Sequence, residues 1–237
     1  MSPAYSEKLK RKAERLQRLR TLRDQMRRCS APALNALDAR MEKYLDFDGG
    51  VFIEAGANDG YTQSNTYYYE TVRGWNGILV EAVPETAEIC RLVRPGAKVY
   101  NCALVANDYP NPTVTMKYAN LTSIVKGLCN DDKREDRHVR LAIERGYIAR
   151  TYDVETPART LTSVIEESGF GHIDFFSLDV EHFELSVLAG LDFDRFGPTF
   201  LLVETRQPDE VARMLPGAYR MVERMTEMDF LFSRKPG

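Results

Sequence analysis

The sequence has few cysteines, and their spacing marks neither a zinc site nor a disulfide framework. Cys29, Cys90, Cys102 and Cys129 are far apart, and none belongs to a CxxC pair. Zinc ribbons and small disulfide-bonded folds need short, repeated cysteine spacings. The pattern therefore excludes those classes and favours a reducing compartment, so we expect a cytoplasmic protein.

Long apolar runs, internal repeats and low-complexity tracts are also missing. Of the 237 residues, 43% are hydrophobic and 28% are charged, which are ordinary values for a globular protein. No apolar segment approaches the ~18 residues of a membrane span, and the basic N-terminus lacks the apolar core of a signal peptide. We expect no transmembrane segment and one α/β domain with extensions.

Charge is unevenly distributed along the chain. Residues 1–30 contain ten Lys or Arg and three Asp or Glu, whereas the remainder contains 22 and 32. Apolar residues recur at steps of three and four from Leu9 to Met26, which is typical of an amphipathic helix. We expect a basic helical extension over residues 1–45, with a second short helix over 33–44. We expect its apolar stripe to pack on the body or on a second copy in a homo-oligomer, and the alternative is that the helix binds an anionic lipid or glycan surface.

From residue 46 to residue 237, short apolar runs alternate with amphipathic ones, as in βα units on a parallel sheet. The expected strands are Val51–Ala55, Gly77–Glu81, Lys98–Ala103, Ile173–Asp179 and Thr199–Glu204. The expected helices are Gly60–Val72, Thr86–Leu92, Leu161–Glu167 and His182–Gly190. Tyr219–Glu223 and Phe230–Arg234 are too close for a parallel crossover, so we expect an antiparallel pair. The predicted fold class is α/β and Rossmann-like, with a mostly parallel central sheet and helices on both faces.

Residues 106–158 are too long for a simple connection between two elements of such a sheet. They include Asp131–Arg140, which is almost wholly charged. We expect an insertion here, which either covers the site as a lid or forms a solvated surface helix.

The first predicted strand runs into Glu54-Ala55-Gly56-Ala57-Asn58-Asp59-Gly60, an ExGxxxG turn. Glycines there allow the backbone to approach a ligand, and a following helix start offers unpaired N–H groups, although such a turn also serves plain strand-to-helix packing. Glu81 ends the second strand, where an acid typically accepts the hydroxyls of a nucleotide ribose. A dinucleotide site favours GxGxxG, which this turn lacks, so NAD is the weaker interpretation.

Acidic residues also end the later strands. Asp179 ends the fourth, with Glu181, His182 and Glu184 just beyond it, and Glu204 ends the fifth. Ligands of open α/β sheets bind at this edge, and such acids contribute little to packing. Our candidate catalytic residues are Asp179, Glu181, His182 and Glu204. Asp179, Glu204 and His182 are also candidate ligands for a divalent metal such as Mg²⁺, although a histidine at that position also suits a helix start.

Four blocks of sequence, in this order, resemble the FkbM family of methyltransferases. They are Phe52 to Gly60, Ser64-Asn65-Thr66-Tyr67, Gly74 to Glu81, and Ile173 to Glu181. The resemblance implies a class I methyltransferase fold, S-adenosylmethionine as the cofactor, and O-methylation of a hydroxyl on a sugar, glycan or glycosylated metabolite. The implied cofactor-binding residues are Glu54, Gly56, Ala57, Asn58, Gly60, Ser64, Asn65, Glu81, Ala82 and Asp179. One departure concerns the acceptor side: His182-Phe183 stands where the family commonly has a glycine.

Two other functions remain as alternatives. One is an NAD-linked oxidoreductase acting on a sugar nucleotide, and the other is a non-catalytic binding protein with the same fold. Retention of the acids and glycines at the strand ends argues against the second. The expected partner is a small-molecule or glycan acceptor, and no nucleic acid is expected.

Overall fold

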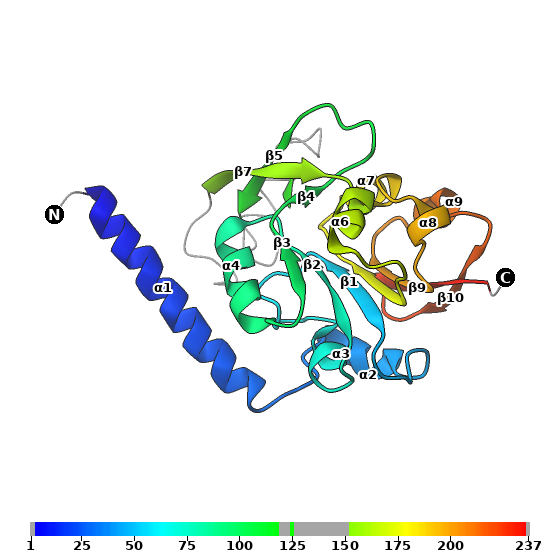
Figure 1. Cartoon of the computed structure of the whole chain (residues 1–237), viewed down its shortest axis with the longest axis horizontal. Helices are drawn as coiled ribbons and strands as arrows, with labels where there is room; N and C mark the ends of the chain where they lie inside the picture. The colour runs from blue at the N-terminus through cyan, green and yellow to red at the C-terminus, as the bar shows by residue number, and fades with distance from the viewer. Residues whose placement is uncertain (1–2, 119–123, 126–151, 236–237) are drawn as a thin grey trace.

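The computed structural model describes residues 3–118, 124–125 and 152–235, and Figure 1 shows their arrangement. A seven-stranded sheet in the order β10-β11-β9-β8-β1-β2-β3 forms the centre of the fold. Its strands are β1 (Val51–Ala55), β2 (Asn76–Val80), β3 (Lys98–Tyr100), β8 (Phe175–Leu178), β9 (Phe200–Glu204), β10 (Tyr219–Arg224) and β11 (Asp229–Arg234). The five strands from β9 to β3 are parallel, while β11 runs antiparallel to both β9 and β10. The predicted α/β class and the C-terminal antiparallel pair are confirmed.

Helices cover both faces of this sheet because successive side chains of a strand point to opposite sides. The helices are α2 (Leu37–Met41), α3 (Tyr67–Thr71), α4 (Pro84–Val93), α6 (Leu161–Ser168), α7 (Glu184–Ala189), α8 (Phe193–Phe196) and α9 (Pro208–Met214). In β1, Phe52 packs in the core that contains α2 and α4, whereas Ile53 packs in the core that contains α6, α7 and α9. The neighbouring strands β1 and β8, in the middle of the sheet, are therefore buried on both faces, which explains their apolar sequences.

The predicted helix over Gly60–Val72 is wrong over most of its length. Only α3, five residues long, is helical, and a loop precedes it. Asp59 accepts hydrogen bonds from the backbone N–H groups of Tyr61 and Thr62, and Glu54 accepts one from Asn65. Side chains that satisfy backbone donors in this way compete with helix formation. The helix start that we expected directly after the glycine turn lies instead at Tyr67.

The predicted strand over Lys98–Ala103 divides into two strands in different sheets. After β3, the Asn101 side chain donates to the carbonyls of Glu81 and Ala82 at 2.8 and 3.0 Å, and this contact accompanies the turn of the chain. A second sheet follows in the order β4-β7-β5-β6. It comprises β4 (Ala103–Leu104), β5 (Thr113–Tyr118), β6 (Ile124–Val125) and β7 (Tyr152–Arg159). The described part of the expected insertion thus forms a sheet, while Asp131–Arg140 lies outside the described residues.

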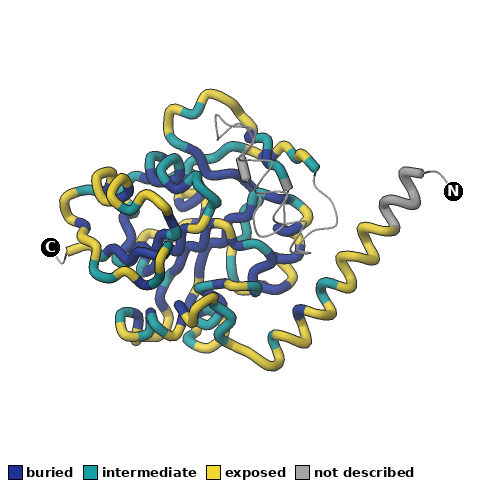
Figure 2. The backbone as a smooth tube through the Cα atoms, turned by 180° about the vertical axis from the view of Figure 1, so that it is seen from behind, coloured by how far each residue is buried: buried dark blue, intermediate teal, exposed yellow. Residues whose placement is uncertain are grey.

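The basic N-terminal segment forms α1 (Pro3–Met26), as predicted, and Figure 2 shows that most of its surface is exposed. It lies beside α4 and contributes buried Leu22 to a small cluster with Tyr61, Tyr67, Ile89 and Val93. The second expected helix is shorter than residues 33–44 and consists of the 3₁₀ turn η1 (Leu34–Ala36) and α2. Within the described part of the chain, no helix combines the length and the apolar character that a membrane crossing requires.

Candidate active site

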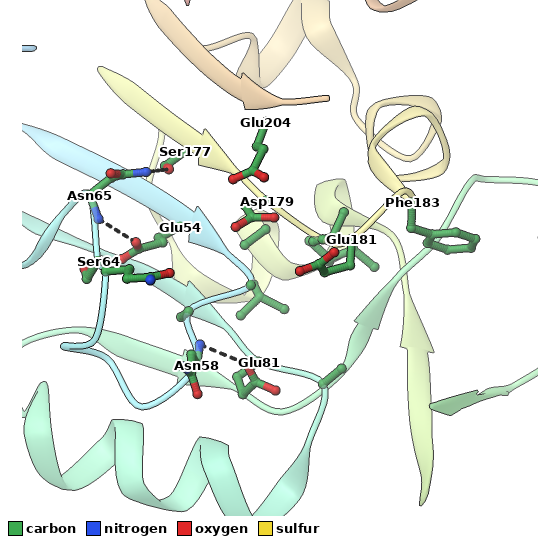
Figure 3. A pocket seen from close by; sticks show the side chains of 18 of the residues that line it. Glu54, Asn58, Ser64, Asn65, Glu81, Ser177, Asp179, Glu181, Phe183 and Glu204 are labelled. Atoms are coloured by element: carbon green, nitrogen blue, oxygen red, sulfur yellow. Dashed lines mark hydrogen bonds between the residues drawn. The ribbon is translucent and has the colours of Figure 1, made fainter. Parts of the chain in front are cut away.

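A cavity of about 420 Å³ opens at the carboxyl edge of β1, β2, β8 and β9, and Figure 3 shows the side chains around it. It is the edge at which parallel α/β sheets bind ligands. The cavity brings together most of the residues predicted from the sequence. They are Glu54, Gly56, Ala57, Asn58, Ser64, Asn65, Glu81, Ala82, Asp179, Glu181 and Glu204. Two predicted residues, Gly60 and His182, are not part of the lining.

Glu81 lies just beyond β2 and holds the loop that follows β1. Its two carboxylate oxygens accept the backbone N–H groups of Asn58 (2.8 Å) and Val83 (2.7 Å). Burial raises the pKa of Glu81 to about 7, although both hydrogen bonds act in the opposite direction. Each carboxylate oxygen has a second lone pair, so Glu81 retains the capacity to accept hydroxyl groups from a ligand.

Glu54, predicted as a cofactor-binding residue, has its carboxylate engaged by the protein itself. It accepts hydrogen bonds from the Ser64 hydroxyl (2.7 Å), the Thr66 hydroxyl (2.6 Å) and the Asn65 backbone N–H (2.9 Å). These contacts fix the loop before α3, whose Asn65 side chain then donates to the Ser177 hydroxyl at 3.0 Å. Glu54 therefore shapes the cavity wall through this loop.

Arg94, at the end of α4, completes this network and was missed in the sequence analysis. Its side chain is fully buried, and its Nε donates to Glu70 at 2.6 Å. Its other nitrogens donate to the Gly60 carbonyl, the Ser64 hydroxyl and the Thr66 hydroxyl at 3.0–3.2 Å, while Glu54 lies 3.7 Å away. An isolated arginine before a turn gives no local sequence signal, because its partners come from distant segments.

Two polar atoms beside the cavity lack hydrogen-bond partners among the described residues. They are Asn58 Nδ2 and Asn65 Oδ1, both of which are buried. Buried polar groups in native proteins are almost always paired, so each such atom requires an explanation. Both residues line the cavity. A polar ligand with an acceptor near Asn58 and a donor near Asn65 would satisfy them.

Gly56 and Gly60 have backbone requirements that differ from those we predicted. Both have left-handed backbone angles, with φ of 83° and 82°. A Cβ atom on Gly56 would lie 1.8 Å from the Asp179 carbonyl oxygen, and one on Gly60 would lie 2.7 Å from the Arg94 side chain. The glycines thus allow close approach between parts of the protein. Gly56 lets the chain after β1 approach the chain after β8, and Gly60 leaves room for Arg94 and Cys90.

We expect Gly56→Ala to destabilise the protein, because the clash is with a backbone atom that has no freedom to move aside. The substitution should lower the free energy of unfolding by about 2 kcal/mol or more, which urea unfolding would measure. Gly217→Ala is the matched control, since a Cβ there meets nothing within 4 Å. Equal unfolding midpoints for the two variants would contradict this interpretation of Gly56.

Asp179 and Glu204 form a carboxyl pair at the ends of β8 and β9, and Figure 3 shows the two groups facing one another. The cavity exposes one side of Asp179, yet protein surrounds the carboxyl closely enough to desolvate it. This burial, together with the charges of Glu204 and Glu181, raises the pKa of Asp179 well above its usual range. Burial and the charge of Asp229 raise the pKa of Glu204 to about 7. Both carboxyls therefore hold their protons to a higher pH than usual, and because they interact they titrate as a coupled pair.

His182 occupies a turn before α7, which begins at Glu184. Its φ is 78°, and its backbone N–H donates to the Glu184 carboxylate at 2.8 Å. The chain therefore turns at His182 before the helix begins. Among the described residues, no three His, Cys, Asp or Glu side chains form a group that could hold a metal ion. A metal site formed by Asp179, Glu204 and His182 stays a prediction.

Apolar residues that the sequence did not single out also line the cavity. Phe183 and Met116 line it together with Ala103 and Leu104, and Leu34 contributes from the N-terminal extension. Phe183 packs against a cluster that includes Met116 of the second sheet. The position at which this chain departs from the family pattern thus contributes an aromatic side chain to the cavity.

Comparisons with known proteins agree with the resemblance of the sequence blocks. Residues 54–232 match the model of the methyltransferase FkbM domain. No curated protein matches the chain. Three similar solved structures are TrmN from Thermus thermophilus, the METTL16 methyltransferase domain, and methyltransferase FkbM from Methylobacillus flagellatus KT.

These three similarities are distant. The identities are 8%, 10% and 14%, and the TM-scores are 0.44, 0.46 and 0.46. The alignments cover 84%, 84% and 78% of this chain, and 48%, 65% and 44% of the respective structures. The chain therefore spans about half the length of the first of them. Such low scores support no conclusion about its acceptor.

Proposed function

Because the chain belongs to the methyltransferase FkbM domain family, we propose that it transfers a methyl group from S-adenosylmethionine to a hydroxyl of a sugar, glycan or glycosylated metabolite. The observation that carries this proposal is the cavity itself. It connects Glu81, suited to a ribose, with a coupled carboxyl pair, suited to an acceptor hydroxyl. A methyltransferase needs these two functions within one enclosed space.

The donor end of the proposed site comprises Glu81, Asn58 and the loop held by Glu54. Glu81 accepts the ribose hydroxyls through its remaining lone pairs. Asn58 Nδ2 and Asn65 Oδ1 pair with polar atoms of the donor, which explains why neither has a partner among the described residues. S-adenosylmethionine supplies a methyl group that its positively charged sulfur already activates for transfer. The residues present therefore fit this cofactor.

The acceptor end comprises the carboxyl pair of Asp179 and Glu204, with Phe183 on the wall. A sugar hydroxyl is weakly acidic, so it needs a base as its oxygen forms the new bond to carbon. An ionised member of the pair takes that proton, and a pKa near 7 suits a base that works near neutral pH. The aromatic face of Phe183 favours an acceptor with a sugar ring.

We expect Glu81→Ala to weaken donor binding. The wild-type protein should bind S-adenosylhomocysteine with micromolar affinity, and the ligand should raise its melting temperature above that of the free protein. The variant loses the ribose acceptor and should bind at least about tenfold more weakly. Isothermal titration calorimetry measures both affinities. Glu85→Ala, on the exposed face of α4, is the control. Equal affinities for Glu81→Ala and wild type would contradict the assignment.

The acceptor class is tested with labelled S-adenosylmethionine and a panel of sugars, sugar nucleotides and glycosides. Transfer to a hydroxyl of at least one panel member is the expected result. Parallel reactions with Mg²⁺ and with a chelator determine whether a divalent metal takes part. Labelling of RNA or of a protein amine instead would refute the proposed acceptor.

The two experiments above also separate the two alternative functions. In the titration, an NAD-linked oxidoreductase would bind NAD and not S-adenosylhomocysteine. In the labelling experiment, a non-catalytic protein would show no transfer to any acceptor.

A homo-oligomer formed through α1 and a lid formed by residues 106–158 remain predictions. Light scattering of the full chain tests the first.

A further inference from the structure

Arg18 of α1 contacts the loop that forms one wall of the cavity. Its Nη2 donates to Asn58 Oδ1 at 2.9 Å and to Asp59 Oδ2 at 2.8 Å. The Arg18 side chain is 27% exposed and that of Asp59 is 3% exposed, so the contact is partly shielded from water. Arg18 lies outside residues 54–232, which match the family model.

Other contacts of α1 hold Arg18 at this position. Arg15 pairs with Glu88 one turn before it, and Leu22 is buried against Tyr61 one turn after it. Residues spaced by three and four lie on the same face of a helix, so these contacts and Arg18 share one surface of α1. Exposed ion pairs contribute little, and burial of Leu22 therefore dominates the docking.

The contact with Arg18 determines how the Asn58 side-chain amide is oriented. A guanidinium group donates hydrogen bonds and accepts none, so the amide oxygen must face it. The amide nitrogen of Asn58 then points away from Arg18, and it has no partner among the described residues. The backbone N–H of Asn58 is held separately by Glu81. Asn58 thus links the N-terminal helix to the proposed ribose acceptor.

We propose that Arg18 is a positioning residue of the donor site: by holding Asn58 and Asp59, it presents the Asn58 amide nitrogen to the donor and keeps the loop against Glu81. This inference rests on the donor site of the proposed function. It gives α1 a role in methyl transfer, in addition to the packing on the body, the pairing with a second copy or the contact with an anionic surface expected from its sequence.

The charge of Arg18 affects the pKa of Glu81, which a purely structural contact between the helix and the body would not change. Glu81 is faced by Arg18 of α1, by Asp59 of the loop, and by Cys90 of α4. Burial raises the pKa of the Cys90 thiol, so this group stays neutral. The positive charge of Arg18 lowers the pKa of Glu81, against the effects of burial and Asp59. A neutral residue at position 18 should therefore raise that pKa above about 7.

The test is calorimetric titration of the full chain with S-adenosylhomocysteine from pH 6 to pH 8.5. Arg18→Met should bind about tenfold more weakly at pH 7.5, and its affinity should rise with pH along a curve displaced to higher pH. Arg18→Lys should retain most of the affinity, because both contacts use one terminal nitrogen. Arg15→Met removes a neighbouring ion pair of the same helix and should bind within about twofold of wild type.

Wild-type affinity and an unshifted pH curve for Arg18→Met would overturn the inference. Failure of the wild-type protein to bind S-adenosylhomocysteine would instead refute the donor site, so the two failures are distinguishable. Thermal melting without ligand checks that each variant is folded. Arg18→Gln is a second neutral variant, for which the same displaced curve is expected.

Discussion

Asp179→Asn is expected to lower turnover at least about a hundredfold, which is typical of the loss of a general base. The asparagine keeps the shape of the side chain but cannot take the proton from the acceptor hydroxyl. Glu204 remains, but without the second carboxyl of the coupled pair. Donor binding should fall much less, because the contacts of Glu81 and Asn58 are unchanged. Initial rates with labelled donor and calorimetric titration measure the two effects separately.

Two controls separate the chemistry of Asp179 from its effect on folding. Asp174→Asn makes the same change immediately before β8, at the end of the strand remote from the cavity, and should leave turnover unchanged. A carboxyl whose pKa is raised on folding stabilises the protein at low pH and loses that contribution as pH rises through the raised pKa. Asp179→Asn removes this loss and should raise the melting temperature at pH 8. Near-normal turnover of the variant would eliminate the pair as the catalytic base.

The pH dependence of wild-type turnover should follow the same pair. Because a base must be ionised, activity should decrease as the pH falls through about 7, the value to which burial raises the pKa of Glu204. A rate that stays constant from pH 8 to pH 5.5 would show that another group takes the proton.

Arg94→Met is expected to destabilise the fold by about 3–5 kcal/mol, because it leaves buried carboxylates without their cation. The side chain has no exposed surface and pairs with Glu70 and Glu54. It also binds the loop that carries Asn65 through the Ser64 and Thr66 hydroxyls. Small domains have only about 5–15 kcal/mol of stability in total, so much of the margin would be lost.

Urea unfolding monitored by tryptophan fluorescence is a suitable measurement, since Trp75 is buried in the same core as Phe52. Arg91→Met changes an exposed arginine of the same helix and is the matched control. Arg94→Lys keeps the charge but not the planar fork of donors, so an intermediate loss is expected. A loss below about 1 kcal/mol in Arg94→Met would show that the network contributes little to stability.

The sequence was sufficient to predict the layers of the fold and the edge of the sheet at which the cavity opens. Apolar runs ending in Glu81, Asp179 and Glu204 identify parallel strands and the side of the sheet at which their carboxyl ends meet. This inference needs only local patterns, because strand periodicity and strand polarity are properties of short segments. The family match spans residues 54–232, which include both the turn after β1 and the end of β8.

Local patterns were insufficient where a residue's partners come from distant segments. The loop before α3 was predicted to be helical because its sequence gives no indication that Glu54, ten residues earlier, takes the hydrogen bonds of Ser64 and Asn65. Arg94 belongs to this network for the same reason, and it is buried only because its partners converge on it from other elements.

The sequence by itself therefore determined the α/β class, the basic helix and the acids at the strand ends. Only the tertiary structure decided that Asp179 and Glu204 form a coupled carboxyl pair, that His182 is not among the residues lining the cavity, and that Arg18 contacts Asn58 across 40 residues. The physical reason is that pKa values and amide orientations depend on what surrounds a group in space. That environment is formed when α1, α4 and the strand ends pack together, and no periodic pattern in the sequence predicts it.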